Sequence, residues 1–135
     1  MIRRTAAQLS EHMRTIRKKD TRPEIAVRRI VHALGYRFRL HRRDLPGTPD
    51  IVLPRHRKVI LVHGCFWHQH ANCRLSKLPR SRTSYWLPKL ARNVQRDETA
   101  LTALRQMGWK ACVIWECEVA DQGRLLKRLN RFLRS

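Results

Sequence analysis

The segment over residues 63–73 concentrates side chains that bind metals or take part in acid–base chemistry. It holds two thiols, three imidazoles and two large aromatic rings within eleven residues. Thiolate sulfur and imidazole nitrogen are the ligands of tetrahedral zinc, and the spacing Cys65-x4-His70-x2-Cys73 lets three of them meet at one point. The two other histidines of the segment are left for a different role.

A closed zinc shell needs a fourth ligand, and the remaining thiols are Cys112 and Cys117. Cys112 lies within an apolar stretch, where a cysteine behaves as a small hydrophobe. Cys117 follows that stretch between two glutamates, so its side chain can reach a neighbouring loop. We therefore predict a zinc site of Cys65, His70, Cys73 and Cys117, which is structural because a filled shell leaves no open position. The alternative is that these side chains only pack.

A second candidate site centres on Asp50, which follows Pro49 and begins an apolar, β-branched stretch. An aspartate at the start of a strand often has only a structural role. Here, however, His63 at the end of the next apolar stretch and His68 shortly after it could both lie near Asp50. A carboxylate that holds a hard cation, beside an imidazole that can take a proton from water, is the minimum for metal-assisted phosphodiester hydrolysis.

The composition points to a polyanionic partner. The chain has 30 Lys and Arg residues against 10 Asp and Glu, a formal net charge of +20, and such an excess repels itself unless a partner such as nucleic acid neutralises it. The alternative is a merely soluble basic protein.

No apolar run is long enough for a membrane span and no secretion signal is visible, so we expect a cytoplasmic protein. Four cysteines in a reducing compartment favour metal ligands or free thiols over disulfides.

Local patterns predict how these residues are positioned. Thr21 can cap a first helix, with Glu24 returning the bond three residues later and Pro23 in the first turn. Pro88 suits the first turn of a second helix, which ends at Gly108. A third helix follows Asp121 and buries four leucines: Leu125, Leu126, Leu129 and Leu133.

Alternating and β-branched segments predict four strands, at residues 36–40, 50–53, 58–62 and 109–115. The first three form a meander, and the connection through the second helix is long enough for the fourth strand to pair in parallel with the third. Residues 65–82 form a long irregular segment that function or metal must organise. The sequence therefore predicts one α/β domain over residues 1–135, with residues 1–19 as a short helix or a flexible arm.

Several motifs together resemble the very-short-patch repair (Vsr) endonuclease family, which nicks DNA beside the T of a T:G mismatch. The resemblance extends from about Met13 to Cys117 and implies a restriction-endonuclease-like core, a mixed central sheet flanked by helices. One residue more than in the family pattern lies between His70 and Cys73. The motifs are residues 45–50, 63–68, 85–87, Lys89, residues 93–97 and 108–109, and residues 114–117.

The resemblance also implies catalytic roles. Asp50 would hold two catalytic Mg²⁺ ions, helped by the backbone carbonyl of Val62. His68 would be the general base, and His63 would support the phosphate or a metal-bound water. The outer shell would consist of Glu24 and Asp97.

The same resemblance implies the DNA contacts. An aromatic wedge of Phe66, Trp67 and Trp86 would enter the base stack, with Met13 in the N-terminal helix or arm approaching from the minor groove. The mismatched pair would be contacted by Lys89 and Asn93. Without the resemblance, the aromatic rings are core residues, Lys89 and Asn93 lie on a solvated helix face, and Met13 is the inner side of an amphipathic helix.

We therefore expect a monomeric, Mg²⁺-dependent endonuclease that nicks one strand 5′ of the T in T:G mismatches and contains one structural Zn²⁺. The resemblance also implies functional coupling to a cytosine methyltransferase and to mismatch-repair proteins. The alternatives are a zinc-stabilised DNA-binding module without catalysis, or a restriction-type nuclease with another target. A metal carboxylate beside a base favours the enzyme, because binding alone has no use for this pair.

Overall fold

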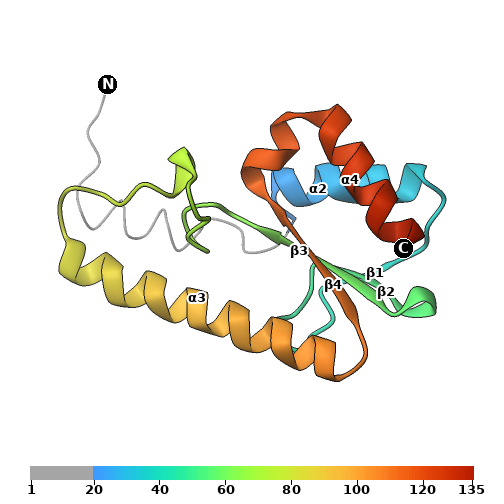
Figure 1. Cartoon of the computed structure of the whole chain (residues 1–135), viewed down its shortest axis with the longest axis horizontal. Coiled ribbons are helices and arrows are strands. Elements are labelled where there is room, and N and C mark those ends of the chain that lie inside the picture. Colours follow the sequence, from blue (N-terminus) through green and yellow to red (C-terminus); the bar gives the residue numbers. More distant parts are fainter. Residues whose placement is uncertain (1–19) are drawn as a thin grey trace.

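The computed structural model describes residues 20–135, so the predicted N-terminal helix or arm, with Met13, lies outside the described residues. A four-stranded sheet has the order β1-β2-β3-β4, and β3 and β4 are parallel while the other two pairings are antiparallel (Figure 1). This arrangement confirms the predicted meander and the parallel crossover. The strands are β1 (Arg39–Leu40), β2 (Ile51–Leu53), β3 (Lys58–His63) and β4 (Lys110–Trp115).

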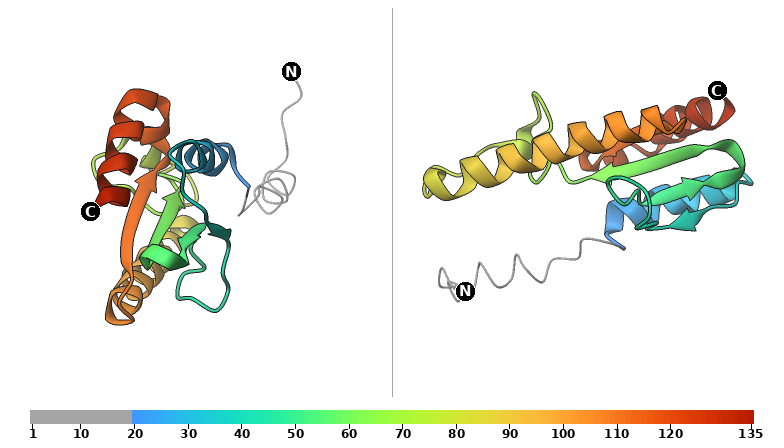
Figure 2. Two further views of the ribbon diagram at one scale, coloured as in Figure 1. Left: turned by 90° about the vertical axis from the view of Figure 1, so that its right-hand side faces the viewer. Right: turned by 90° about the horizontal axis from the view of Figure 1, so that it is seen from below.

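Three described helices cover the two faces of the sheet. They are α2 (Arg22–Ala33), α3 (Thr83–Gln106) and α4 (Gln122–Arg134). α2 and α4 lie on one face and α3 on the other, as Figures 1 and 2 show from three directions. The part of the chain that the structure describes is therefore a mixed α/β arrangement in three layers.

Alternation along the strands supplies both cores. Ile51, Leu53 and Ile60 face α2 and α4, whereas Val52 and Val59 face α3. Successive strand residues point to opposite faces, so a strand covered on both sides must be apolar at nearly every position. All three residues of β2 are buried, which explains its uninterrupted apolar sequence.

The helix α2 begins as predicted but with a different bond from its glutamate. Thr21 Oγ1 accepts from the Glu24 backbone N–H (3.4 Å). The predicted return bond from Glu24 to Thr21 is wrong, because Glu24 Oε2 accepts instead from the Asp20 N–H (2.7 Å). Glu24 is 1% exposed, so its carboxyl group points into the protein rather than along the helix surface.

Three other details differ from the predicted elements. β1 is only two residues long, and both are exposed. α3 begins at Thr83, so Pro88 lies inside the helix; its start has no side-chain cap, and the sequence therefore carried no start signal. Leu126 of α4 is 45% exposed, because the spacing of the other three leucines defines the buried face and leaves it outside.

The end of α4 is fixed by a buried lysine of β3. Lys58 Nζ donates to the backbone carbonyls of Phe132 (3.0 Å), Leu133 (2.8 Å) and Ser135 (2.7 Å). The last carbonyls of a helix have no partner within the helix and carry partial negative charge, so an ammonium group satisfies both needs. Over residues 20–135, no helix is long and apolar enough to cross a membrane.

Candidate active site and metal cluster

Asp50 is placed by the antiparallel pairing of β2 and β3. It immediately precedes β2, and its Oδ2 accepts from the backbone N–H of Val62 (2.6 Å) near the end of β3. Because Val62 precedes His63, the carboxylate lies next to the strand end that carries the predicted histidines. The Val62 N–H is thus used to orient Asp50, while the carbonyl of the same residue is the predicted second metal ligand.

Asp50 and Glu24 form a pair of carboxyl groups in hydrogen-bond contact. Burial, and then the hydrogen bond with Glu24, raise the pKa of Asp50 to about 8. Burial also opposes ionisation of Glu24, but its hydrogen bonds with Asp50, His41 and the Asp20 N–H, together with the charge of Arg28, outweigh it and lower its pKa. Two adjacent carboxyl groups share a proton unless a cation takes its place, so this pair suits a divalent metal.

His41 also belongs to this cluster, although its sequence context does not indicate a role in the site. Its Nε2 lies 2.8 Å from Glu24 Oε1 and 4.0 Å from Asp50 Oδ1. His41 directly follows the short strand β1, and its backbone N–H donates to the Asp50 carbonyl (3.2 Å). His41 follows the strand that pairs with β2. This position places it near Asp50, but only the register of the two strands reveals that.

The other three predicted catalytic residues meet in a second cluster. His68 Nδ1 lies 2.6 Å from Asp97 Oδ2 of α3, and the His63 ring stacks on the His68 ring with centroids 3.9 Å apart. Burial, and then the neighbouring His68, lower the pKa of His63 to about 4. A carboxylate on Nδ1 fixes the imidazole tautomer and leaves Nε2 as a proton acceptor, so this geometry can support a general base.

The structure also brings the four predicted zinc ligands together. One ligand atom from each of Cys65, His70, Cys73 and Cys117 lies within 4.8 Å of the others, and His70 Nδ1 is 3.7 Å from Cys65 Sγ and 3.4 Å from Cys117 Sγ. Cys112 lies apart from them in the core between the sheet, α2 and α4.

The chemistry of this cluster fits a metal ion. Burial, and then the neighbouring cysteines, raise the pKa of the Cys65 thiol to about 12, so a cation is needed to hold it as a thiolate. His70 stacks on Trp115, with ring centroids 4.1 Å apart, which fixes its orientation. Gln69 and Asn72, which directly precede the ligands His70 and Cys73, adopt left-handed backbone conformations with φ angles of 49° and 55°.

The predicted wedge residues form one aromatic cluster. The rings of Phe66, Trp67 and Trp86 have centroids 5.1 to 5.9 Å apart, and all three residues are partly exposed. From α3, Lys89 Nζ lies 5.7 Å from the Trp67 ring and Asn93 Nδ2 donates to the Trp67 carbonyl (3.1 Å). Partial exposure distinguishes this cluster from the two buried cores.

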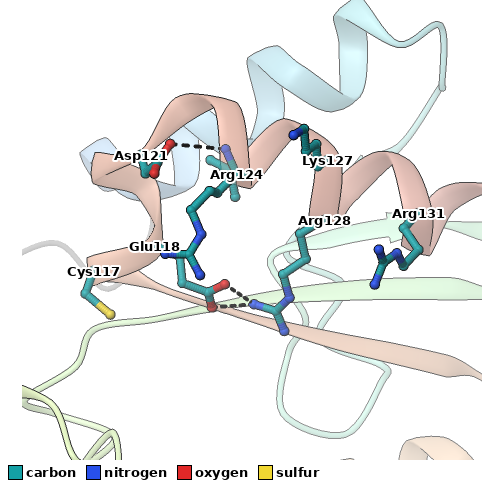
Figure 3. Close-up of a pocket in the computed structure, with 8 residues that line it drawn as sticks. Cys117, Glu118, Asp121, Arg124, Lys127, Arg128 and Arg131 are labelled. Atoms are coloured by element: carbon teal, nitrogen blue, oxygen red, sulfur yellow. Dashed lines mark hydrogen bonds and ion pairs between the residues drawn. The ribbon is translucent and has the colours of Figure 1, made fainter.

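A basic groove of about 500 Å³ adjoins the Cys/His cluster on the α4 side, where Cys117 is one of its lining residues (Figure 3). Glu118 forms an ion pair with Arg128, whose Nη2 also donates to the Val113 carbonyl of β4 (2.8 Å). The remaining lining residues are Asp121, Leu125 and three further cations of α4: Arg124, Lys127 and Arg131. This surface offers positive charge outside the two candidate catalytic clusters.

Comparison with known proteins identifies the family. A family model described as DNA mismatch endonuclease Vsr matches residues 3–74. The chain is 54% identical over 121 residues to the type II nicking enzyme V.XorIIP of Xanthomonas oryzae, an alignment that covers 90% of this chain and 88% of that protein. It is 38% identical over 130 residues to the type II nicking enzyme V.NmeAIP of Neisseria meningitidis, covering 96% and 92%. It is 40% identical over 119 residues to the DNA mismatch endonuclease Vsr of Escherichia coli, covering 88% and 76%. The chain is therefore a DNA endonuclease that belongs to the DNA mismatch endonuclease Vsr family.

Proposed function

We propose that this endonuclease nicks one strand of duplex DNA on the 5′ side of the T in a T:G mismatch, in a Mg²⁺-dependent reaction that starts very-short-patch repair. The observation that carries the proposal is the approach of two clusters at the end of β3. Asp50 bonds to Val62, and the next residue, His63, stacks on the His68 that Asp97 holds. The Asp50–Glu24 carboxyl pair thus adjoins an oriented imidazole.

In this proposal, Asp50 and the Val62 carbonyl would hold Mg²⁺, and the bound ion would supply stabilisation of negative charge on the scissile phosphate. His68 accepts the proton of the attacking water at Nε2, while Asp97 holds Nδ1 and keeps the ring in place. His63 packs flat against His68 and would support the phosphate or a metal-bound water, and Glu24 would remain in the outer shell. The fold is then a restriction-endonuclease-like core with a single carboxylate as the direct metal anchor.

The aromatic cluster supplies the selectivity for a mismatch. Insertion of Phe66, Trp67 and Trp86 between bases requires unstacking, which costs a few kcal/mol and costs least where pairing is already weak. Lys89 and Asn93 would contact the mismatched pair, since both lie beside Trp67 of the wedge. Met13 would approach from the minor groove as part of residues 1–19.

The Cys/His cluster is proposed to hold one structural Zn²⁺ that pins the loop bearing the wedge to the end of β4. The protein would work as a single-domain monomer on DNA in the bacterial cytoplasm, coupled to a cytosine methyltransferase and to mismatch-repair proteins. The cations of the groove along α4 would add contacts to DNA phosphates.

A nicking assay on end-labelled duplexes carrying each mismatch tests the proposal. With Mg²⁺, the protein should cut the T strand of a T:G duplex and leave matched DNA largely intact. Asp50→Ala should abolish cutting and keep mismatch binding, because it removes the metal anchor and no DNA contact. Cutting by Asp50→Ala at the parent rate would refute this active site. Equal cutting of matched and mismatched duplexes by the parent would leave a nuclease with another target.

A further inference from the structure

Glu24 is held by donors on both carboxylate oxygens. Oε2 accepts from the Asp20 N–H (2.7 Å) and from Arg28 Nη2, and Oε1 is 2.8 Å from His41 Nε2. A glutamate side chain has three rotatable bonds, so a fixed α2 backbone does not by itself fix the carboxylate. The three donors therefore decide where this buried group points.

His41 is the one of these donors that also approaches Asp50. Its Nε2 lies 4.0 Å from Asp50 Oδ1, while its backbone N–H donates to the Asp50 carbonyl (3.2 Å). The backbone bond ties His41 to the strand that carries Asp50, and the ring bond ties it to the helix that carries Glu24. His41 thus links the helix that carries Glu24 to the strand end that carries Asp50.

We propose that His41 is a positioning residue for the nicking reaction: by donating from Nε2 to Glu24 Oε1, it holds the Glu24 carboxylate against Asp50 and so shapes the outer shell of the cation bound there. The proposal rests on the proposed metal role of Asp50. It requires only a hydrogen on Nε2, which the charged ring and one neutral tautomer both carry.

A direct metal role for His41 fits the contacts less well. One ligand atom each from Asp20, Glu24 and His41 lies within 4.8 Å of the others, as a metal site would need. However, Arg28 Nη2 bonds to both carboxylates, so a cation placed there would meet a guanidinium group. The same contacts are what a hydrogen-bonded support for Glu24 requires.

The test compares His41→Leu with His41→Gln, whose amide restores an N–H donor, and with the exposed His32→Leu as a control on α2. Mn²⁺ binding to the protein without DNA is measured by calorimetry, beside kcat and KM for nicking of the T:G duplex. His41→Leu should weaken Mn²⁺ binding about 10-fold or more and lower kcat with KM for DNA unchanged, since outer-shell partners typically contribute 10- to 100-fold to metal affinity. His41→Gln should regain most of both, and His32→Leu should match the parent.

Two further variants keep the outcomes separate. Asp50→Asn should lose Mn²⁺ binding altogether; if it does not, the proposed metal site itself is wrong. If Asp50→Asn loses the ion and His41→Leu binds it like the parent, only the role of His41 is overturned. If His41→Leu unfolds, His41→Asn replaces it, because the shorter amide cannot reach Glu24. His41→Asn should weaken Mn²⁺ binding in the parent and have little further effect in Glu24→Gln. A loss of Mn²⁺ affinity that is additive with Glu24→Gln, or no loss in the parent, would contradict action through Glu24.

Discussion

Asp50→Asn should make the fold more stable at neutral and alkaline pH while it abolishes nicking. Burial and Glu24 raise the pKa of Asp50 from 3.8 to about 8, so the folded protein binds this proton more tightly than the unfolded chain does. As the pH rises from about 4 to about 8, the unfolded chain ionises first and stability falls. Asparagine keeps an oxygen for the Val62 N–H and carries no charge at any pH, so it avoids this loss.

The size of the effect follows from the two pKa values. A pKa difference of one unit between the folded and unfolded states corresponds to about 1.4 kcal/mol of folding stability. The difference between 3.8 and about 8 therefore sets an upper bound of about 6 kcal/mol on the stability that Asp50 can remove. Part of this loss of stability has already occurred at pH 5, and relaxation around the Asp50–Glu24 pair reduces the loss that remains between pH 5 and pH 8. We expect the stability advantage of Asp50→Asn over the parent to grow by about 2 kcal/mol between pH 5 and pH 8.

Urea unfolding of both proteins at pH 5 and pH 8 measures this difference, in buffer without added Mg²⁺ and without a chelator that would strip the Cys/His cluster. Asp44→Asn is the control: Asp44 is exposed and Arg42 lowers its pKa, so its contribution is lost as pH falls, not as it rises. Added Mg²⁺ should stabilise the parent and leave Asp50→Asn unchanged. An advantage that stays constant from pH 5 to pH 8 would refute the reasoning.

Four further outcomes are expected. The purified protein should contain about one zinc ion per chain; Cys117→Ser should release it and lower the melting temperature, whereas Cys112→Ser should retain it, as metal analysis of the variants will show. Affinity for a matched duplex should fall with salt with a log–log slope of about −0.9 per phosphate neutralised, and a slope near zero in binding titrations would exclude DNA as the partner. His68→Ala should lose the nick and Asp97→Asn should slow it, both in single-turnover assays, because each removes part of the oriented base; parent rates would contradict this role. Trp67→Ala should reduce the preference for mismatched over matched duplex by about 1–3 kcal/mol in competition binding, the typical worth of one stacked base.

Much of the fold was predictable because local signals and layer rules agree in this chain. The cap at Thr21, the left-handed turn at Gly108 and the cap at Asp121 lie where the sequence places helix ends. The start of α3 was predicted too late. Its first turn has no capping side chain, so Pro88 was the nearest start signal that the sequence offered. Leu126 was misplaced because four nearby leucines fit more than one helical stripe, and only packing against the sheet selects among them.

The candidate site was predictable where ligand chemistry dictates spacing, as in the Cys/His cluster, and where the family motif carried residues over. The roles of these residues remain proposals. The partnership of Glu24 and His41 was not predictable, because it joins a helix to the end of a two-residue strand. Neither residue lies in a local sequence pattern that indicates this contact. Glu24 instead fits a capping box, of which the structure forms only the bond from the Glu24 N–H to Thr21.

The parallel register of β3 and β4 also sets an order of events during synthesis. His63 pairs with Trp115, so Cys65 and Cys117 each lie two residues beyond the last pair and become neighbours only after both strands dock. After the ribosome has added Cys73, it must add 44 more residues (117 − 73) to reach Cys117, the fourth residue of the Cys/His cluster. Closing such a long loop is a late step, because distant contacts must await the chain between them. A nascent chain that stalls within α3 would therefore have an incomplete Cys/His cluster and a β3 strand without its parallel partner.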